Sequence, residues 1–423
     1  MDDTTKPTRR SLQGRSPPPG ASPRSRRGLD WFVFFVADVQ TGFGPFVAVY
    51  LTSQKWTQVD IGLILTIGGL ISLFGQVPGG AILDAVRSPR LIAAVSVIAV
   101  GISAVMLALW PIFAIVLFSR ILQASASCLL GPAIAAMSLG LVERREAGER
   151  FGRNAAFASV GTGLAAAGMG ACGYYISNQA VFFVTGALVV PALLSLMWIR
   201  SDEINVARSH GGERSETAGT LAALAHVFGN PALLIFALCV MLFHLANAAI
   251  LPLVAGLMTL RSSVSAPAFI AAAMVVPQFV VALLSPVVGR KARTWGRRPL
   301  LLIGFAALAA RIGLFAYVTS PSMVVVVQVL DGLSAAVLGV LVPLSIADLT
   351  RNTGRFNLTQ GAVGCAMGIG ASISTTMAGY LTDRFSSSAT FLVLGGIATL
   401  GLLAVWLLMP ETRPPEETED TQK

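Results

Sequence analysis

The sequence predicts an all-α membrane protein whose twelve transmembrane helices form two pseudo-symmetric six-helix bundles. Three observations support this fold class. The chain has 423 residues, of which 54% are hydrophobic and only 12% charged, about half the charged share of a typical soluble domain. Its mean hydropathy is +0.73, and apolar runs long enough to cross a bilayer recur along it. Finally, matching sequence features recur in the two halves at a nearly constant spacing.

Apolar runs between charged breaks define the predicted spans, and the longest polar interruption, residues 200–229, divides them into two groups of six. The spans are expected at 30–52, 60–84, 91–109, 111–141, 155–176, 179–199, 231–258, 265–289, 299–318, 321–347, 358–381 and 388–409. The domain prediction is therefore a disordered basic tail over 1–28, bundles over 29–199 and 230–410, a linker over 200–229 and a second tail over 411–423.

The net charge of +9 follows the predicted topology. With the N-terminus on the cytoplasmic side, the inner loops hold sixteen Lys and Arg residues, and the outer loops hold only Lys55, Arg261 and Arg384. Such an excess of positive charge marks cytoplasmic loops. We therefore expect a multi-pass protein of the cytoplasmic membrane with both termini inside, and no nucleic-acid partner. The four cysteines, which all lie in apolar segments, suggest neither disulfides nor a metal site.

The two halves share features in the same order. Pro45 matches Pro252 at an offset of 207, and the segment beginning at Arg120 aligns with that beginning at Gln328 at an offset of 208. Repeats of this kind are typical of transporters, whose sites lie at the repeat interface near the bilayer midplane. The matched prolines are predicted to bend the first helix of each half, either as gates or as static kinks.

Two loop motifs and one helix motif resemble the major facilitator superfamily over residues 30–409. The loop after the second span has Gly80, Asp84 and Arg90, and its counterpart has Gly289, followed by Gly-Arg-Arg-Pro at 296–299. The fourth span has Arg120 and Gln123 in the order of the family's R-x-x-Q-G motif. Drug/proton antiporters of the family carry a Gly-Pro-rich fifth helix, whereas residues 158–175 here contain glycine but no proline.

The resemblance implies a twelve-helix transporter of the drug/metabolite:proton type that works by alternating access. It also implies roles in conformational change for the loop-motif residues, which are Gly80, Asp84, Arg90, Gly289, Gly296 and Arg297.

Few charged residues lie deep in the predicted spans, and such residues often mark transport paths. Asp38 and Arg120 are expected at similar depth in helices 1 and 4, so we predict that they face each other and couple protons. Burial favours the protonated carboxylate and a nearby arginine the ionised form. The alternative is a pair that only holds the helices together. Arg311 and Asp331, at similar distances from one helical hairpin, are predicted to form a structural ion pair.

Other polar residues at comparable depth predict a substrate cavity with hydrogen-bonding groups, although each one alone could serve only packing. They are Gln40, Gln123, His244, Asn247, Gln278, Gln328 and Asp331. His244 is also a candidate second titrating group.

The sequence contains no nucleotide-binding loop and no nucleophile–base constellation, so neither direct ATP drive nor an enzyme is expected. No cofactor or metal is predicted. The expected partners are a small-molecule substrate, protons and the lipid bilayer, and the expected oligomeric state is a monomer. Three functions remain open: efflux of small organic compounds, proton-linked uptake of a polar metabolite such as a sugar or organic acid, and a non-transporting membrane sensor.

Overall fold

The computed structural model describes residues 21–43, 45–212, 229–261, 266–318 and 320–414, and these ranges contain helices but no strand. The first half comprises α1 (Pro23–Thr41), α2 (Pro45–Ser53), α3 (Gln58–Phe74), α4 (Gln76–Ala85), α5 (Pro89–Leu109), α6 (Phe113–Leu141), α7 (Ala147–Tyr175) and α8 (Ala180–Met197). After the short linker helix α9 (Val206–Ser209), the second half comprises α11 (Pro231–Asn247), α12 (Ile250–Arg261), α13 (Ala266–Trp295), α14 (Arg297–Phe315), α15 (Pro321–Leu349), α16 (Phe356–Arg384) and α17 (Ser387–Leu407).

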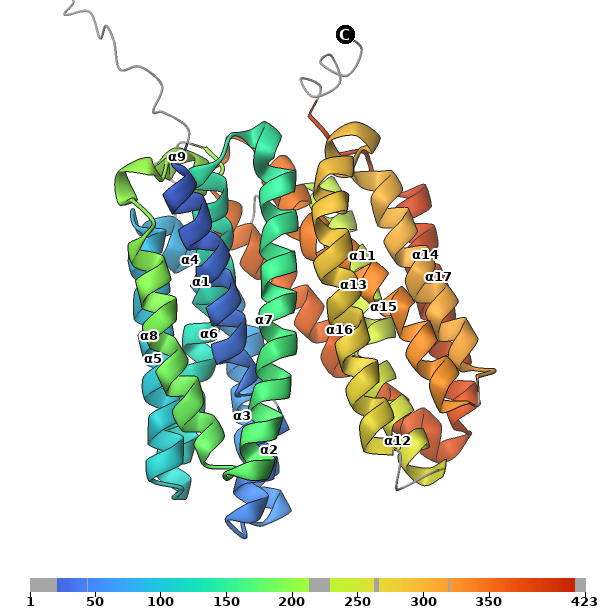
Figure 1. The fold of residues 1–423 in the computed structure, drawn as a ribbon. Coiled ribbons are helices and arrows are strands. Elements are labelled where there is room, and N and C mark those ends of the chain that lie inside the picture. Colours follow the sequence, from blue (N-terminus) through green and yellow to red (C-terminus); the bar gives the residue numbers. More distant parts are fainter. Residues whose placement is uncertain (1–20, 44, 213–228, 262–265, 319, 415–423) are drawn as a thin grey trace, which may run out of the picture.

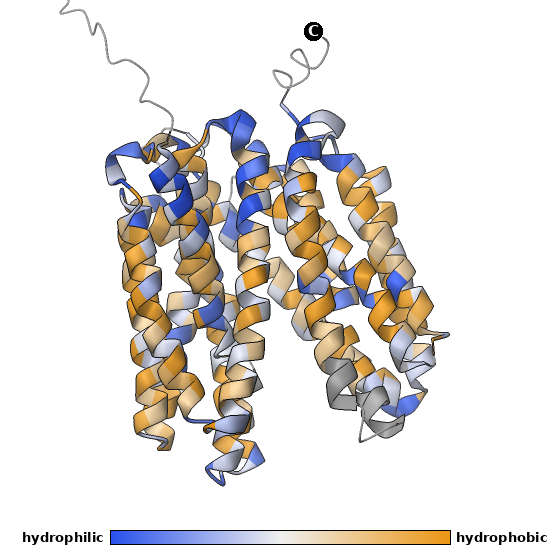
Figure 2. Cartoon of the chain, in the orientation of Figure 1, coloured by the Kyte–Doolittle hydropathy of each residue, from blue (hydrophilic) through white to orange (hydrophobic). Residues whose placement is uncertain are grey.

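The helices have the length and composition of membrane spans. Within the described residues, eleven helices are long and apolar enough to cross a bilayer, and α3 with α4, bent by 46°, makes up to twelve. Figure 2 shows hydrophobic residues along the helices and hydrophilic residues gathered at one end. The predicted fold class is confirmed.

The first span of each half is broken near its predicted proline. Helix α1 ends at Thr41 and α2 begins at Pro45, while α11 ends at Asn247 and α12 begins at Ile250, two residues before Pro252. Proline lacks a backbone N–H and disfavours the helical conformation of the residue before it, so a helix tends to break close to a proline. The matching breaks are consistent with the predicted repeat.

The two halves lie side by side and meet along two helix pairs, α7 with α13 and α4 with α16 (Figure 1). The described ends of the chain and α9 lie at the same end of the bundle, which we call the linker end (Figure 1). One apolar core fills the first half, around Phe32, Val97 and Phe182. A second core, which contains Phe236 and Phe305, also includes Phe151 of α7, so it spans both halves.

Helix α7 begins at Ala147, eight residues before the predicted span at 155. Its first two turns contain Arg150 and Asn154, and because these residues are polar the predicted span began after them. Both side chains are buried, and Arg150 Nε donates a hydrogen bond of 3.0 Å to Asn154 Oδ1 one turn later. Their satisfied polar groups let the helix continue to the linker end.

Candidate functional site

A polar cluster in the second half joins three helices around Arg311 of α14. Arg311 is 1% exposed, and its Nη1 lies 2.5 Å from Asp331 Oδ1 of α15. It also donates hydrogen bonds to Asn247 Oδ1 of α11 (2.6 Å) and Gln328 Oε1 of α15 (2.9 Å). The predicted contact between Arg311 and Asp331 is therefore present, and two amides from the predicted cavity share the same guanidinium.

Gln328 extends this cluster to a fourth helix. Its amide nitrogen donates a hydrogen bond of 3.0 Å to the backbone carbonyl of Ala273 in α13. Because Gln328 is 1% exposed, both ends of its amide are fixed by these contacts. The cluster thus ties together α11, α13, α14 and α15.

The first half contains a buried arginine that has no acidic partner within the described part of the chain. Arg120 of α6 is 8% exposed, and its Nη1 donates a hydrogen bond of 2.8 Å to Gln123 Oε1 one turn later. Gln123 in turn donates to Ser127 Oγ at 2.9 Å, and the guanidinium lies 5.7 Å from the centre of the Phe43 ring. Among the described residues, Arg120 forms no ion pair, and its Nε has no hydrogen-bond partner.

Asp38 of α1 does not meet Arg120, so the predicted contact between them is absent from this structure. Asp38 is 5% exposed, its Oδ1 lacks a hydrogen bond, and this oxygen would lie 3.1 Å from a Cβ at Gly161 of α7. Arg120 instead faces α3, where a Cβ at Gly68 would lie 3.1 Å from its Nη2. Similar depth placed the two residues at one level, but α1 packs mainly on α7 and α8, and its rotation turns Asp38 toward α7.

The other predicted cavity residues are dispersed. Gln40 is exposed near the end of α1, and His244 Nδ1 lies 2.9 Å from the carbonyl of Val240 in its own helix. Gln278 of α13 is half-buried and faces α7 in the other half, where a Cβ at Gly163 would lie 3.8 Å from its own Cβ. The structure therefore brings together Asn247, Gln328 and Asp331, but not these three.

Asp84 joins the two halves at the linker end. From the end of α4, its carboxylate accepts hydrogen bonds from the backbone N–H groups of Asn357 (3.3 Å) and Leu358 (2.8 Å) in the first turn of α16. The Asn357 side chain donates a further bond of 2.8 Å. A carboxylate is stabilised at a helix N-terminus by the free N–H groups and the helix dipole. Asp84 thus caps a helix of the opposite half.

Two of the predicted loop-motif glycines allow the halves to approach closely at this end. A Cβ at Gly80 would lie 2.2 Å from the carbonyl oxygen of Asn357, and one at Gly289 would lie 2.3 Å from that of Gly148 in α7. Any side chain at either position would force the helices apart. Gly80 and Gly289 therefore occupy related places on the two sides of the contact between the halves.

The remaining loop-motif residues contact parts of their own half or the linker. Arg90 Nη1 donates a hydrogen bond of 2.9 Å to Ser201 Oγ. Gly296 has a φ of 93°, a conformation that suits glycine, and Arg297 Nε lies 2.9 Å from Asp348 Oδ2 of the same half. Neither of these two contacts joins the two six-helix bundles.

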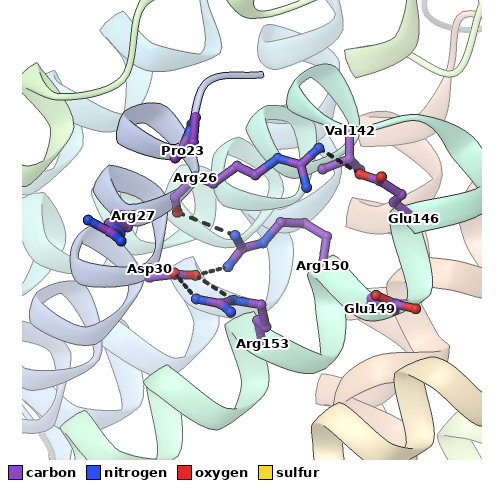
Figure 3. Close-up of a pocket in the computed structure, with 9 residues that line it drawn as sticks. All are labelled: Pro23, Arg26, Arg27, Asp30, Val142, Glu146, Glu149, Arg150 and Arg153. Carbon is purple, nitrogen blue, oxygen red and sulfur yellow. Dashed lines mark hydrogen bonds and ion pairs between the residues drawn. The ribbon is translucent and has the colours of Figure 1, made fainter. Parts of the chain in front are cut away.

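The linker end also holds a charged cavity of about 300 Å³ that the sequence did not indicate (Figure 3). At its floor, Asp30 of α1 is 2% exposed and forms ion pairs with Arg150 and Arg153 of α7. Arg26 closes one side through an ion pair of 2.8 Å with Glu146. The cavity is lined by Pro23, Arg26, Arg27, Asp30, Val142, Glu146, Glu149, Arg150 and Arg153.

Asp30 was not predicted as a site residue because it is the first residue of a predicted span, where an acid is expected at the membrane interface. The segment 144–153 could have indicated it, since its four arginines lie around the start of a helix and favour acidic partners nearby. The buried pair of Asp30 with Arg150 fixes α1 against α7 at the end opposite Asp38.

Comparison with known proteins places these features in context. The family model "Major Facilitator Superfamily" matches residues 31–277 and 236–423. Two uncharacterized MFS-type transporters of Mycobacterium tuberculosis, from strains CDC 1551 / Oshkosh and ATCC 25618 / H37Rv, are each 36% identical over 399 residues. These matches cover 92% of this chain and 94% of each relative.

Among solved structures, the proton:xylose symporter XylE bound to 6-bromo-6-deoxy-D-glucose is similar to this chain in fold. The TM-score is 0.67 at 17% sequence identity, and the alignment covers 95% of this chain and 98% of the other.

Proposed function

The chain belongs to the major facilitator superfamily, and from this premise we propose that it is a proton-coupled secondary transporter of a small organic molecule, working by alternating access. It is a multi-pass membrane transporter and not an enzyme. The observation that carries the proton coupling is the isolation of Asp38, a buried carboxylate of α1 that has no cationic partner among the described residues.

Isolation suits Asp38 to the task because burial favours its protonated form and no cation among the described residues holds it ionised, so access of water from one side would allow it to release the proton. Its unbonded Oδ1 faces the glycine-rich helix α7. Helix α7 also packs on α13 of the other half, so movement between the halves changes the surroundings of the α1–α7 contact. We propose that this movement alternates the access of protons to Asp38.

We propose that the linker end faces the cytoplasm and that the protein resides in the cytoplasmic membrane. The support is the excess of Lys and Arg residues at this end, which include Arg87, Arg145, Arg200, Arg290 and Arg351. Under this orientation, both termini are cytoplasmic.

We also propose that Asp84 holds the cytoplasmic side closed. Hydrogen bonds to charged groups contribute about 1.5–3 kcal/mol each, so loss of the carboxylate should favour opening at the linker end by at least about 2 kcal/mol, or roughly 30-fold. Asp84→Ala is therefore expected to lengthen the distance between spin labels at Glu143 and Lys291, two exposed positions flanking the α7–α13 contact. Double electron–electron resonance on a variant lacking the four free cysteines measures this distance.

The matched control for this gate is Asp202→Asn, which removes an exposed acid at the same end that forms an ion pair of 3.0 Å with Arg200. It should leave the distance distribution unchanged. A distribution for Asp84→Ala that coincides with that of Asp202→Asn would rule out the lock.

Two directions of transport are candidates. Efflux is the first, proposed from the resemblance to drug/metabolite transporters. Proton-linked uptake of a polar metabolite, such as a sugar or organic acid, is the second. One observation favours it: α7 contains no proline, unlike the fifth helix of drug/proton antiporters, although it carries the close glycine contacts with α1 and α13.

The experiment that tests this function is a flux assay with the full chain in proteoliposomes under an imposed pH gradient. Flux is measured in turn for drugs, sugars and organic acids, once with equal pH on both sides of the membrane and once with a pH gradient. Proton coupling predicts that the gradient drives net movement of at least one compound. With the acidic side outside the vesicles, co-transport moves the compound inward and exchange moves it outward. Flux that ignores the gradient for every transported compound would refute the coupling.

A further inference from the structure

We propose that Arg120 binds the negatively charged group of the transported compound, so that the substrate class is a small organic carboxylate. This inference rests on the proposed function and deepens it. It is carried by the isolation of Arg120 in the first half, by the contrast with Arg311 in the second half, and by the balance of charge within the membrane.

Arg120 is a buried cation that no acidic side chain in the described ranges neutralises. Only 8% of Arg120 is exposed, and within the described ranges no carboxylate forms an ion pair with it. The neutral amide of Gln123 satisfies Nη1, while Nε has no acceptor. A buried charge without a partner costs several kcal/mol, a cost that an anionic ligand would relieve.

The repeat explains why this arginine stands alone. At the offset of 208, Arg120 corresponds to Gln328, and Gln123 corresponds to Asp331. The second half therefore has an acid at this position, and that acid lies 2.5 Å from Arg311. The first half has a neutral amide in its place. Of the two deep arginines, Arg311 thus has an acidic partner within its own half, whereas we propose that the partner of Arg120 is an acid from outside the protein.

The surroundings of Arg120 suit a carboxylate with an apolar body. The ring of Phe43 lies against the guanidinium, with 5.7 Å between the ring centre and Cζ. On the α3 side the neighbour is Gly68, whose missing side chain gives the guanidinium room to turn, since a Cβ there would lie 3.1 Å from Nη2. Arginine binds planar carboxylates through two parallel N–H groups, and its Nε edge is the one without an acceptor here.

Charge balance links this site to Asp38. In the empty carrier, Asp38 and Arg120 lie in the same half but form no ion pair among the described residues. A carboxylate bound at Arg120 brings a second negative charge into the middle of this half, and a like charge favours the protonated form of Asp38. Among the described residues, no hydrogen bond or ion pair joins Asp38 or Arg120 to another titratable side chain, and their neighbours include Phe43, Gly68, Gln123 and Gly161. Proton and carboxylate should therefore travel in the same direction, which favours uptake over exchange.

The test uses the purified full chain and measures thermal unfolding with pairs of compounds that differ only in charge. The pairs are acetate and acetamide, lactate and lactamide, succinate and succinamide, and benzoate and benzamide. At least one carboxylate should raise the unfolding midpoint, and its amide should not. Sodium chloride and sodium phosphate at equal ionic strength separate recognition of an organic acid from capture of any anion.

Arg120→Gln should weaken binding of that carboxylate at least tenfold, and Arg120→Lys, which keeps the charge, should weaken it less. The Gln variant should fold because it removes an unpaired buried charge. Arg87→Gln, at an exposed position, is the matched control and should bind as the wild type does. Asp38→Asn should keep the carboxylate preference, so failure of proton coupling and failure of this site give different results.

Four outcomes would overturn the proposal. They are the absence of stabilisation by every carboxylate, equal stabilisation by carboxylate and amide, equal stabilisation by chloride, and unchanged carboxylate affinity in Arg120→Gln.

Discussion

Asp38→Asn should abolish transport driven by a pH gradient, while the protein still folds and inserts into the membrane. Asparagine keeps the shape of the side chain but cannot take up and release a proton. Because Asp38 forms no ion pair among the described residues, its replacement leaves no cation unpaired and should not lower stability. In proteoliposomes, gradient-driven flux is expected to fall to the level of protein-free vesicles.

Two further variants make this result specific. Asp38→Glu retains a carboxylate and should retain part of the gradient-driven flux. Asp383→Asn removes an exposed acid near the end of α16 and should transport as the wild type does. Exchange of substrate at equal pH on both sides separates coupling from binding: Asp38→Asn should still exchange substrate. Full gradient-driven transport in Asp38→Asn would exclude the residue from coupling.

The fold could be predicted from the sequence because bilayer thickness dictates the length of each apolar run. The same rule failed at helix ends that leave the apolar region. Helix α7 continues eight residues beyond its predicted span because Asp30 neutralises Arg150, a contact between residues far apart in the chain. The bend between α3 and α4 at Gly75 was also missed, since one apolar run covers both helices.

Contacts within the site were predictable only where the chain fixes the geometry. Arg311 and Asp331 lie on consecutive antiparallel helices, so their distances from one turn set their relative depth and made the contact foreseeable. Asp38 and Arg120 lie on helices that are not consecutive. Depth in the membrane brought them to one level, but the rotation of each helix about its axis, which depends on packing with α7 and α3, directs them apart.

The pair of Arg311 with Asp331 leads to the largest expected effect on stability. Asp331→Asn leaves a guanidinium that is 1% exposed with only the amides of Asn247 and Gln328 as acceptors. Breaking a buried ion pair by removing one partner typically costs 3–5 kcal/mol, and we expect a cost of about 3 kcal/mol here, because two hydrogen bonds remain. The midpoint of thermal unfolding in detergent should fall clearly below that of Asp383→Asn, the exposed-acid control.

The double variant Arg311→Gln with Asp331→Asn identifies the cause of that loss. If the cost comes from the unpaired charge, removing the charge as well should restore most of the stability, because neutral amides can satisfy one another in the same space. A double variant as unstable as Asp331→Asn would instead attribute the loss to packing around Asp331. The contrast with Arg120 follows directly: Arg120→Gln removes a cation that has no acid to lose, so it should unfold at the same temperature as the wild type or higher.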